Sequence, residues 1–214
     1  MTTTAPTTAV ERALAAEGFE RVAGLDEVGR GAWAGPVSVG VAVTPRGRRA
    51  PAGLRDSKLV PEAEREALFP RVTSWCIDWS VGHAEPGECD RLGMTLALRL
   101  AARRALAGLA VAPDVVLMDG SFDYLTDPDD PASGPAVRTV VKGDRTCTTI
   151  AAASIVAKVT RDRMMRALAE DFPAFDFHSN KGYPSPVHRT ALCGRGLTSI
   201  HRRSWSYVDG LPFR

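Results

Sequence analysis

Residues 24–37 read GLDEVGRGAWAGPV. The stretch leaves the hydrophobic run VAGL on two adjacent acids, Asp26 and Glu27, and then passes through an arginine between two glycines. It continues into a second apolar run, VSVGVAVT (37–44). Apolar, β-branched runs of this length, bounded by glycine and proline, predict two strands. The sequence therefore places two carboxylates at a strand end, beside a loop whose glycines allow close approach to the backbone.

Two further apolar segments also finish on acids. DVVLMDG (114–120) contains Asp119, and AVRTVVKGD (136–144) ends on Asp144; we predict a strand for each segment. Because ligand sites of open α/β sheets gather at strand ends, we expect these acids to converge. A single acid after a strand is commonly a helix cap or a turn residue, so a purely structural role is the alternative.

Converging carboxylates have a direct chemical consequence. They repel one another unless cations neutralise them. Hard oxygen ligands select Mg²⁺ or Mn²⁺, and two such ions about 3.5–4 Å apart form a clamp for in-line displacement at phosphorus. The sequence thus predicts metal-assisted phosphoryl chemistry, with these catalytic and metal-binding residues: Asp26, Glu27, Asp119 and Asp144.

The remaining segments predict helices that follow or separate the strands. We expect helices at 10–19, 61–69, 94–110, 148–172 and 186–196, a third strand at 74–84, and loops at 46–60, 121–135 and 178–186. Three strands followed by strands alternating with helices are typical of the α/β class, with a mixed central sheet flanked by helices.

Composition predicts one folded domain. The chain has 214 residues, of which 44% are hydrophobic and 24% charged. We expect residues 1–9 to be a disordered tail and 10–214 to be the domain, with about 173–214 as a helical and loop appendage. No apolar run approaches the roughly 20 residues of a membrane span, and the N-terminus does not resemble a signal peptide, so a cytoplasmic location without membrane contact is expected. The four cysteines form no CxxC pair, which argues against zinc and disulfides.

The charge distribution is uneven. Residues 1–141 carry 15 Lys and Arg against 19 Asp and Glu, whereas residues 142–214 carry 12 against 6. A basic, phosphate-facing surface is therefore expected in the last third of the chain. Its candidate phosphate contacts, for which a surface salt-bridge face is the alternative, are His188, His201, Arg202 and Arg203.

Seven blocks, in order, make the chain resemble ribonuclease HII. They are GLDEVGRGAWAGPV (24–37), DSKLV (56–60), LMDG (117–120), KGD (142–144), IAAASIVAKVTRDR (150–163), NKGYPSPVH (180–188) and GLTSIHRRSW (196–205). The resemblance implies a ribonuclease H-like fold and a monomeric endonuclease. It implies cleavage of the RNA strand of RNA–DNA hybrids and nicking 5′ to ribonucleotides embedded in duplex DNA, as in ribonucleotide excision repair. A two-metal-ion mechanism leaving a 3′-OH and a 5′-phosphate is also implied.

The resemblance assigns further residues. The four metal-binding acids of the family fall on the strand-end acids named above. The family element whose backbone contacts the 2′-OH at the cleavage junction matches Gly29, Arg30 and Gly31, and the 2′-OH is what separates RNA from DNA. The junction-sensing tyrosine of the family, which stacks on the following deoxyribose, matches Tyr183. Positions resembling the family's phosphate contacts are Lys58, Ser154 and Lys158.

Other functions stay open at this stage. A resolvase or integrase core shares carboxylates at strand ends, but it would cut all-DNA substrates and has no need of the glycine-arginine-glycine element. A non-catalytic hybrid-binding protein would keep the basic last third, but it has no use for four converging acids. The C-terminal sequence SYVDGLPFR contains no clear motif for binding a replication clamp.

Overall fold

The two apolar runs that flank the GRG stretch form the centre of a five-stranded sheet. In the computed structural model, which describes residues 5–212, β1 (Val22–Val28) pairs antiparallel with β2 (Val37–Val43). β3 (Asp78–Ala84) adds antiparallel to β2, while β4 (Val115–Asp119) and β5 (Ala136–Val140) continue parallel from β1. The strand order is β3-β2-β1-β4-β5, which confirms the mixed sheet of an α/β fold.

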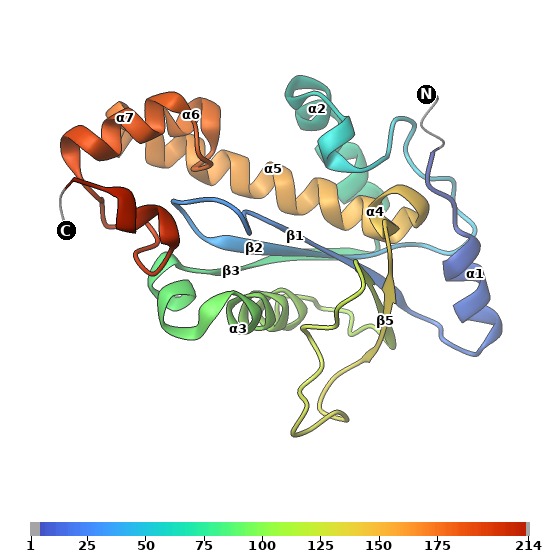
Figure 1. The fold of residues 1–214 in the computed structure, drawn as a ribbon. Helices are drawn as coiled ribbons and strands as arrows, with labels where there is room; N and C mark the ends of the chain where they lie inside the picture. Colours follow the sequence, from blue (N-terminus) through green and yellow to red (C-terminus); the bar gives the residue numbers. More distant parts are fainter. Residues whose placement is uncertain (1–4, 213–214) are drawn as a thin grey trace.

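Helices cover both faces of this sheet, with α5 (Thr148–Asp171) on one side and α3 (Pro86–Ala107) on the other (Figure 1). Two strand glycines let α5 lie close. A Cβ built on Gly24 would lie 2.1 Å from the carbonyl carbon of Thr149, and one on Gly40 would lie 2.6 Å from the carbonyl oxygen of Ala153. Any larger residue at either position would push α5 off the sheet. No helix within residues 5–212 is both long and apolar enough to cross a bilayer.

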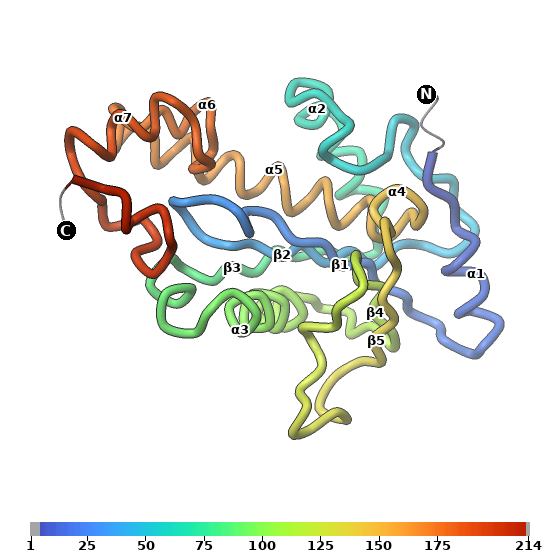
Figure 2. Tube along the Cα trace, in the orientation of Figure 1, coloured from blue at the N-terminus to red at the C-terminus, as the bar shows by residue number. Residues whose placement is uncertain are grey.

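Helix α1 (Ala9–Ala16) and the C-terminal elements lie at opposite ends of the molecule (Figure 2). Between them, α2 (Glu62–Trp75) packs on α5 through a shared apolar cluster. At the other end are η2 (Pro173–Phe175), α6 (Phe177–Asn180), α7 (Pro186–Arg195) and η3 (Ser206–Gly210). These C-terminal elements pack on the far end of α5 around an apolar cluster that contains Met165, Phe175 and Phe177.

Several boundaries differ from those that the sequence predicts. α2 continues through Pro70 to Trp75, so β3 begins only at Asp78. α3 begins at Pro86, because a capping box starts it and Gly93, with φ of 74°, joins two helical segments across a kink. Helix capping and tertiary packing therefore override the local pattern here.

The placement of Asp144 at the end of a strand is wrong. β5 ends at Val140, and Lys142 then adopts a left-handed conformation with φ of 57°. This reversal starts the short helix α4 (Gly143–Thr146), which carries Asp144. A Cβ on Gly143 would lie 2.4 Å from Cδ1 of Ile150, so a larger residue where α4 meets α5 would displace that side chain.

Part of the expected N-terminal tail is ordered. Residues 1–4 lie outside the described residues, but Thr7 forms a parallel bridge with Cys147. The Thr7 amide donates to the carbonyl of Thr146, and the Thr148 amide donates to the carbonyl of Thr7. Residues 5–8 therefore form a strap that ties the N-terminus to the start of α5.

The prediction that His188, His201 and Arg202 face phosphate is wrong. Their exposed fractions are 0%, 1% and 0%, so neither a phosphate surface nor a salt-bridge face describes them. The side chain of Arg203 is exposed, and its amide donates to the carboxylate of Asp90. The sequence could not separate them because the buried and exposed positions of HRR are adjacent.

The two histidines form a hydrogen-bonded chain that requires both rings to be neutral. The Thr198 amide donates to Nδ1 of His201, so the proton of that ring lies on Nε2. His201 Nε2 lies 2.9 Å from His188 Nε2, which must accept. His188 Nδ1 can then donate to the carbonyl of Tyr183 at 2.9 Å. The chain therefore links the C-terminal core to the segment that carries Tyr183.

The neutral pair predicts sensitivity to acid. Burial lowers the pKa of His201 to about 3 and also lowers the pKa of His188. Their contribution to stability is complete above about pH 6.5, the unfolded value, and is lost as the pH falls from there toward the folded value. We expect the melting temperature to fall between pH 7 and pH 5, and His201→Phe to flatten that dependence. The exposed His178→Gln variant is the control, and an unchanged slope in His201→Phe would contradict this account.

Candidate active site

The sheet brings the four predicted acids to one edge. Asp26 and Glu27 lie near the end of β1, and Asp119 ends the parallel neighbour β4. The strand register pairs Leu25 with Met118, so Asp26 and Asp119 follow at the same level. α4 delivers Asp144, whose amide lies 3.4 Å from Oδ1 of Asp119. We refer to these four residues as the acid cluster.

The acid cluster holds negative charge where there is little water. Asp26 is only 4% exposed, and burial raises its pKa well above the usual range. The positive charge of Lys58 opposes this rise, while Glu27, Asp119 and Asp144 add to it. Burial also raises the pKa values of Glu27 and Asp144. Such an arrangement favours the binding of a cation.

The chemistry of the donors fits a divalent ion of the Mg²⁺ or Mn²⁺ type, since all four are carboxylates. Their positions are not yet a closed ligand shell. Within residues 5–212, no three His, Cys, Asp or Glu side chains stand in an arrangement that could hold an ion. Instead, the ammonium of Lys58 lies 3.5 Å from Oδ2 of Asp144 and supplies positive charge at the cluster.

Lys58 reaches the cluster because a short turn presents it. The 3₁₀ turn η1 (Ser57–Leu59) begins at Asp56, whose carboxylate accepts from the Lys58 amide. The Ser57 amide donates to the hydroxyl of Ser154 on α5 at 3.0 Å. Ser154 is 1% exposed, so it faces the interior and does not present its hydroxyl to phosphate. We infer that it positions the Lys58 turn.

Lys158, one turn further along α5, is committed to another partner. Its ammonium donates to both carboxylate oxygens of Asp162, at 2.5 and 2.7 Å. Burial lowers the pKa of Lys158, against the effect of Asp162. A phosphate contact from Lys158 stays a prediction, because it would have to compete with this ion pair.

The GRG loop, residues 29–36, leaves the acid cluster directly. Gly29 has φ of 85°, and its amide donates to the hydroxyl of Tyr183 at 3.0 Å. Arg30 is exposed, and its guanidinium lies 3.8 Å from the Glu27 carboxylate. A Cβ on Gly31 would meet nothing within 4 Å, so its backbone borders open space. The structure thus brings Tyr183 into contact with the GRG loop, while the substrate roles of both stay predictions.

A buried arginine from the C-terminal segment holds this loop. Arg202 donates to three main-chain carbonyls: Nη2 to Gly29 at 2.7 Å, Nη1 to Arg30 at 3.0 Å, and Nε and Nη2 to Gly35 at 3.3 and 3.1 Å. Burial lowers its pKa. Arg202 therefore positions the loop and has no direct route to substrate.

Arg161 of α5 makes a second set of such contacts. It donates to the carbonyls of Pro36, Lys181 and Ala34 at 2.8, 2.8 and 3.1 Å. Its guanidinium also lies 5.5 Å from the centre of the Tyr183 ring. The motif VTRDR contains Arg161, but sequence reasoning gave it no role. One sequence signal could have indicated a buried role for Arg161: it lies on the predicted helix among positions whose neighbours are buried.

Tyr124 was also missed. The sequence predicts only a loop at 121–135 and gives Tyr124 no role, yet Tyr124 is 3% exposed and donates to Oε2 of Glu27 at 3.1 Å. Burial raises its pKa, which keeps the hydroxyl protonated as a donor. Asp123 holds the turn by accepting from the amides of Leu125 and Thr126. The start of this loop therefore orients one of the predicted metal ligands.

Comparison with known proteins agrees with this geometry. The family model for ribonuclease HII matches residues 23–208. A ribonuclease HII from Streptomyces griseus is 56% identical over 211 residues, covering 97% of this chain and 86% of that protein. The crystal structure of the ribonuclease H2 from Pyrococcus horikoshii has a TM-score of 0.73 and 31% identity, covering 89% of this chain and 96% of that one.

A further solved relative is the ribonuclease HII of Archaeoglobus fulgidus in a complex with PCNA. It has a TM-score of 0.72 and 26% identity, covering 87% of this chain and 95% of that one. Sequence and fold agree over nearly the whole length, and the chain belongs to the ribonuclease HII family, whose members are endoribonucleases.

Proposed function

We propose that this enzyme hydrolyses the RNA strand of RNA–DNA hybrids and nicks duplex DNA 5′ to an embedded ribonucleotide, as needed for ribonucleotide excision repair. The proposal rests on one observation: two acids of the acid cluster and the GRG loop are neighbours on one stretch of chain. The acid cluster includes Asp26 and Glu27, and the loop tied to Tyr183 begins at Gly29. The residues proposed for phosphoryl chemistry and those proposed for sugar recognition therefore lie within a few positions of one another.

The acid cluster would hold one or two Mg²⁺ or Mn²⁺ ions. Bound divalent ions supply activation of water and neutralisation of charge on the reacting phosphate, which leads to a 3′-OH and a 5′-phosphate. The chain itself orients the ligands. Tyr124 fixes one oxygen of Glu27, and the Asp144 amide contacts Asp119. The side chain of Lys58 is 64% exposed. When a metal cation neutralises the acid cluster, the ammonium of Lys58 would be available to bind a phosphate of the substrate.

We assign the selection of ribose to the backbone of the GRG loop and to the ring of Tyr183. The open space at Gly31 lets main chain approach a sugar closely, and the 2′-OH offers both a donor and an acceptor. Tyr183 is held by the Gly29 amide and by Arg161, so its half-buried ring has a set position. A deoxyribose can pack against such a ring, whereas an added hydroxyl would clash with it. Substrate recognition then favours a ribose followed by a deoxyribose over a ribose within a continuous RNA strand.

We further propose that the enzyme acts as a monomer in the cytoplasm, with nucleic acid as its partner. The PCNA complex belongs to the archaeal relative. In this chain the segment SYVDGLPFR offers no clear motif for a clamp contact, and the proposed activity does not include one.

A cleavage assay tests the proposal. A labelled DNA duplex with one ribonucleotide is incubated with the enzyme and either Mg²⁺ or Mn²⁺, beside an all-DNA duplex. We expect a nick on the 5′ side of the ribonucleotide. The all-DNA duplex should be cut about 10⁴-fold more slowly, because a site built to bind a hydroxyl discriminates strongly against its absence. Equal cutting of both duplexes would instead indicate a resolvase-like nuclease.

A further inference from the structure

The fold uses much of the positive charge in the last third of the chain internally. Arg161 and Arg202 are buried and bonded to carbonyls. Other cations of this region are held in ion pairs with Asp or Glu: Arg145, Lys158, Arg163, Arg166 and Lys181. The excess of basic residues in that region therefore does not translate into an equally basic surface.

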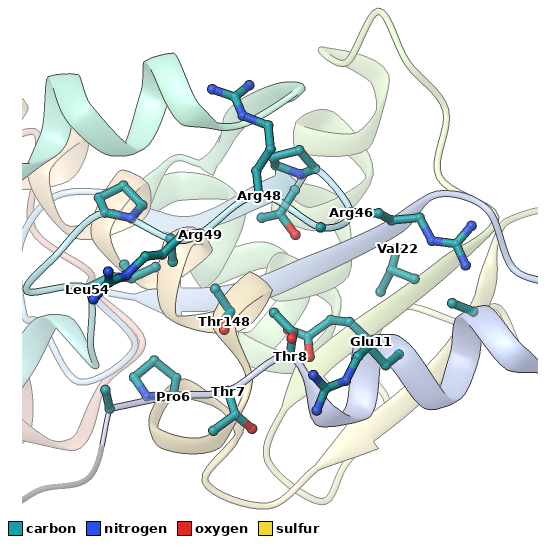
Figure 3. Close-up of a pocket in the computed structure, with 18 of the residues that line it drawn as sticks. Pro6, Thr7, Thr8, Glu11, Val22, Arg46, Arg48, Arg49, Leu54 and Thr148 are labelled. Carbon is teal, nitrogen blue, oxygen red and sulfur yellow. The ribbon is translucent and has the colours of Figure 1, made fainter.

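Exposed positive charge gathers instead around a cavity of about 1290 Å³ near the N-terminus. The cavity lies between the strap (residues 5–8), α1 and the loop 44–54 that follows β2 (Figure 3). Its lining includes four exposed arginines, which we call the arginine cradle: Arg12, Arg46, Arg48 and Arg49.

The arginines of the cradle lack acidic partners. Among residues 5–212, no Asp or Glu side chain forms an ion pair with any of them. The loop sequence TPRGRRAPAGLR (44–55) itself contains no acid. Figure 3 shows Arg46, Arg48 and Arg49 along this loop, across the cavity from the strap. Unpaired guanidinium groups in this number favour a ligand with several negative charges.

The floor of the cavity limits how such a ligand can bind. Glu11 lies on the α1 side, where Oε1 accepts from the amide and hydroxyl of Thr149 at the start of α5. Its Oε2 is buried and has no hydrogen-bond partner in the described part of the chain. A carboxylate in the floor repels anions, so negative groups would rest on the arginine rim. An extended polyanion fits this arrangement better than a small anion seated deep in the cavity.

Two separate chain segments connect the cavity that the cradle borders to the acid cluster. Leu54 lines the cavity, and Lys58 contacts the cluster four residues later. Thr148 lines the cavity, and Asp144 precedes it by four residues. Four residues span at most about 14 Å. Since each strand of a duplex advances about 3.4 Å per nucleotide, this reach corresponds to about four base pairs.

We propose that the arginine cradle binds the phosphate backbone of the duplex, about four base pairs to one side of the scissile bond. The inference rests on the proposed function, which places a duplex at the acid cluster. Contacts to phosphate set the position of a protein on a duplex and add affinity without reading sequence. The cradle would thereby orient the duplex across the cluster whatever the sequence around the ribonucleotide.

The test is a triple variant, Arg46→Gln/Arg48→Gln/Arg49→Gln. Its matched control removes three exposed arginines on α2 and α3: Arg71→Gln/Arg91→Gln/Arg103→Gln. Anisotropy of a labelled 24-base-pair duplex with one central ribonucleotide is measured in EDTA, which prevents cutting, between 50 and 200 mM salt. For the cradle variant we expect the slope of log K against log salt to fall by about 3 and the affinity at low salt to fall at least tenfold.

Duplex length provides the second arm of the experiment. Duplexes are shortened to three base pairs beyond the ribonucleotide on one side or on the other. Shortening one side only should abolish the difference between the wild-type enzyme and the cradle variant. Equal affinity and slope in the cradle variant and the control variant would overturn the proposal, as would equal losses on shortening either side.

The two proposals fail in distinguishable ways. If the cradle is irrelevant, the wild-type enzyme still nicks the ribonucleotide duplex, and both triple variants bind it alike. If the proposed function is wrong, the wild-type enzyme does not nick this duplex, whatever the binding data show. Melting temperatures of both variants are expected to equal that of the wild type, because all the replaced side chains are exposed.

Discussion

Replacing Asp26 with asparagine is expected to reduce cleavage of the ribonucleotide duplex at least about 10³-fold while leaving the protein folded. The amide keeps the shape of the side chain but loses the charge that a divalent ion needs. Without metal, the melting temperature should stay equal or rise at pH 7. The reason is that burial and three neighbouring acids raise the pKa of Asp26, which means that its ionised form is unfavourable in the folded state.

Asp129→Asn is the matched control. Asp129 is an exposed acid of the loop 121–135 and lies outside the acid cluster. Rates and melting temperatures of both variants are measured with and without Mn²⁺. Cleavage by Asp26→Asn within tenfold of the wild-type rate would show that Asp26 is not a metal ligand. A large loss in Asp129→Asn would show that the loop contributes to catalysis directly.

Arg202→Gln is expected to lower the cleavage rate about 100-fold through displacement of the GRG loop, although Arg202 has no contact with the acid cluster. Its guanidinium donates hydrogen bonds to the carbonyl oxygens of Gly29, Arg30 and Gly35. Each buried carbonyl left without a donor costs about 1–3 kcal/mol, so stability falls as well. The conservative variant Arg202→Lys should also fail, since a single ammonium cannot reproduce the planar fork.

A stability loss alone would not establish the positioning role, so hydrogen exchange provides the decisive reading. Amides of the GRG loop should exchange faster in Arg202→Gln, while those of β1 and β2 stay protected. Arg195→Gln, which changes an exposed arginine at the end of α7, should leave both exchange and cleavage unchanged. Uniformly faster exchange across the sheet would mean that Arg202 serves only global stability.

The candidate site could be predicted from sequence where its chemistry is local. Asp26 and Glu27 follow an apolar run directly within β1, and the glycines beyond them mark a loop. Asp119 ends a buried strand in the same way. Asp144 was correctly expected near the other acids, but the sequence predicted it at the end of a strand and the structure places it on helix α4. Lys142 adopts a left-handed conformation at the start of α4, which local sequence patterns do not predict for a lysine.

Sequence by itself determined the α/β class, the central pair of strands and the acids at their ends, because alternation, apolar runs and turn residues act over a few positions. Tertiary structure decided which charges meet substrate and which serve the interior. Arg202 and Gly29, which it contacts, are more than 170 residues apart. The same separation holds for Tyr207 and Trp33, whose carbonyl accepts from the Tyr207 hydroxyl at 3.2 Å. The partners of a buried arginine are main-chain carbonyls, which every residue possesses. Composition therefore assigned the basic surface to the last third, whereas folding buries or pairs much of that charge and leaves the arginines beside the N-terminal strap exposed.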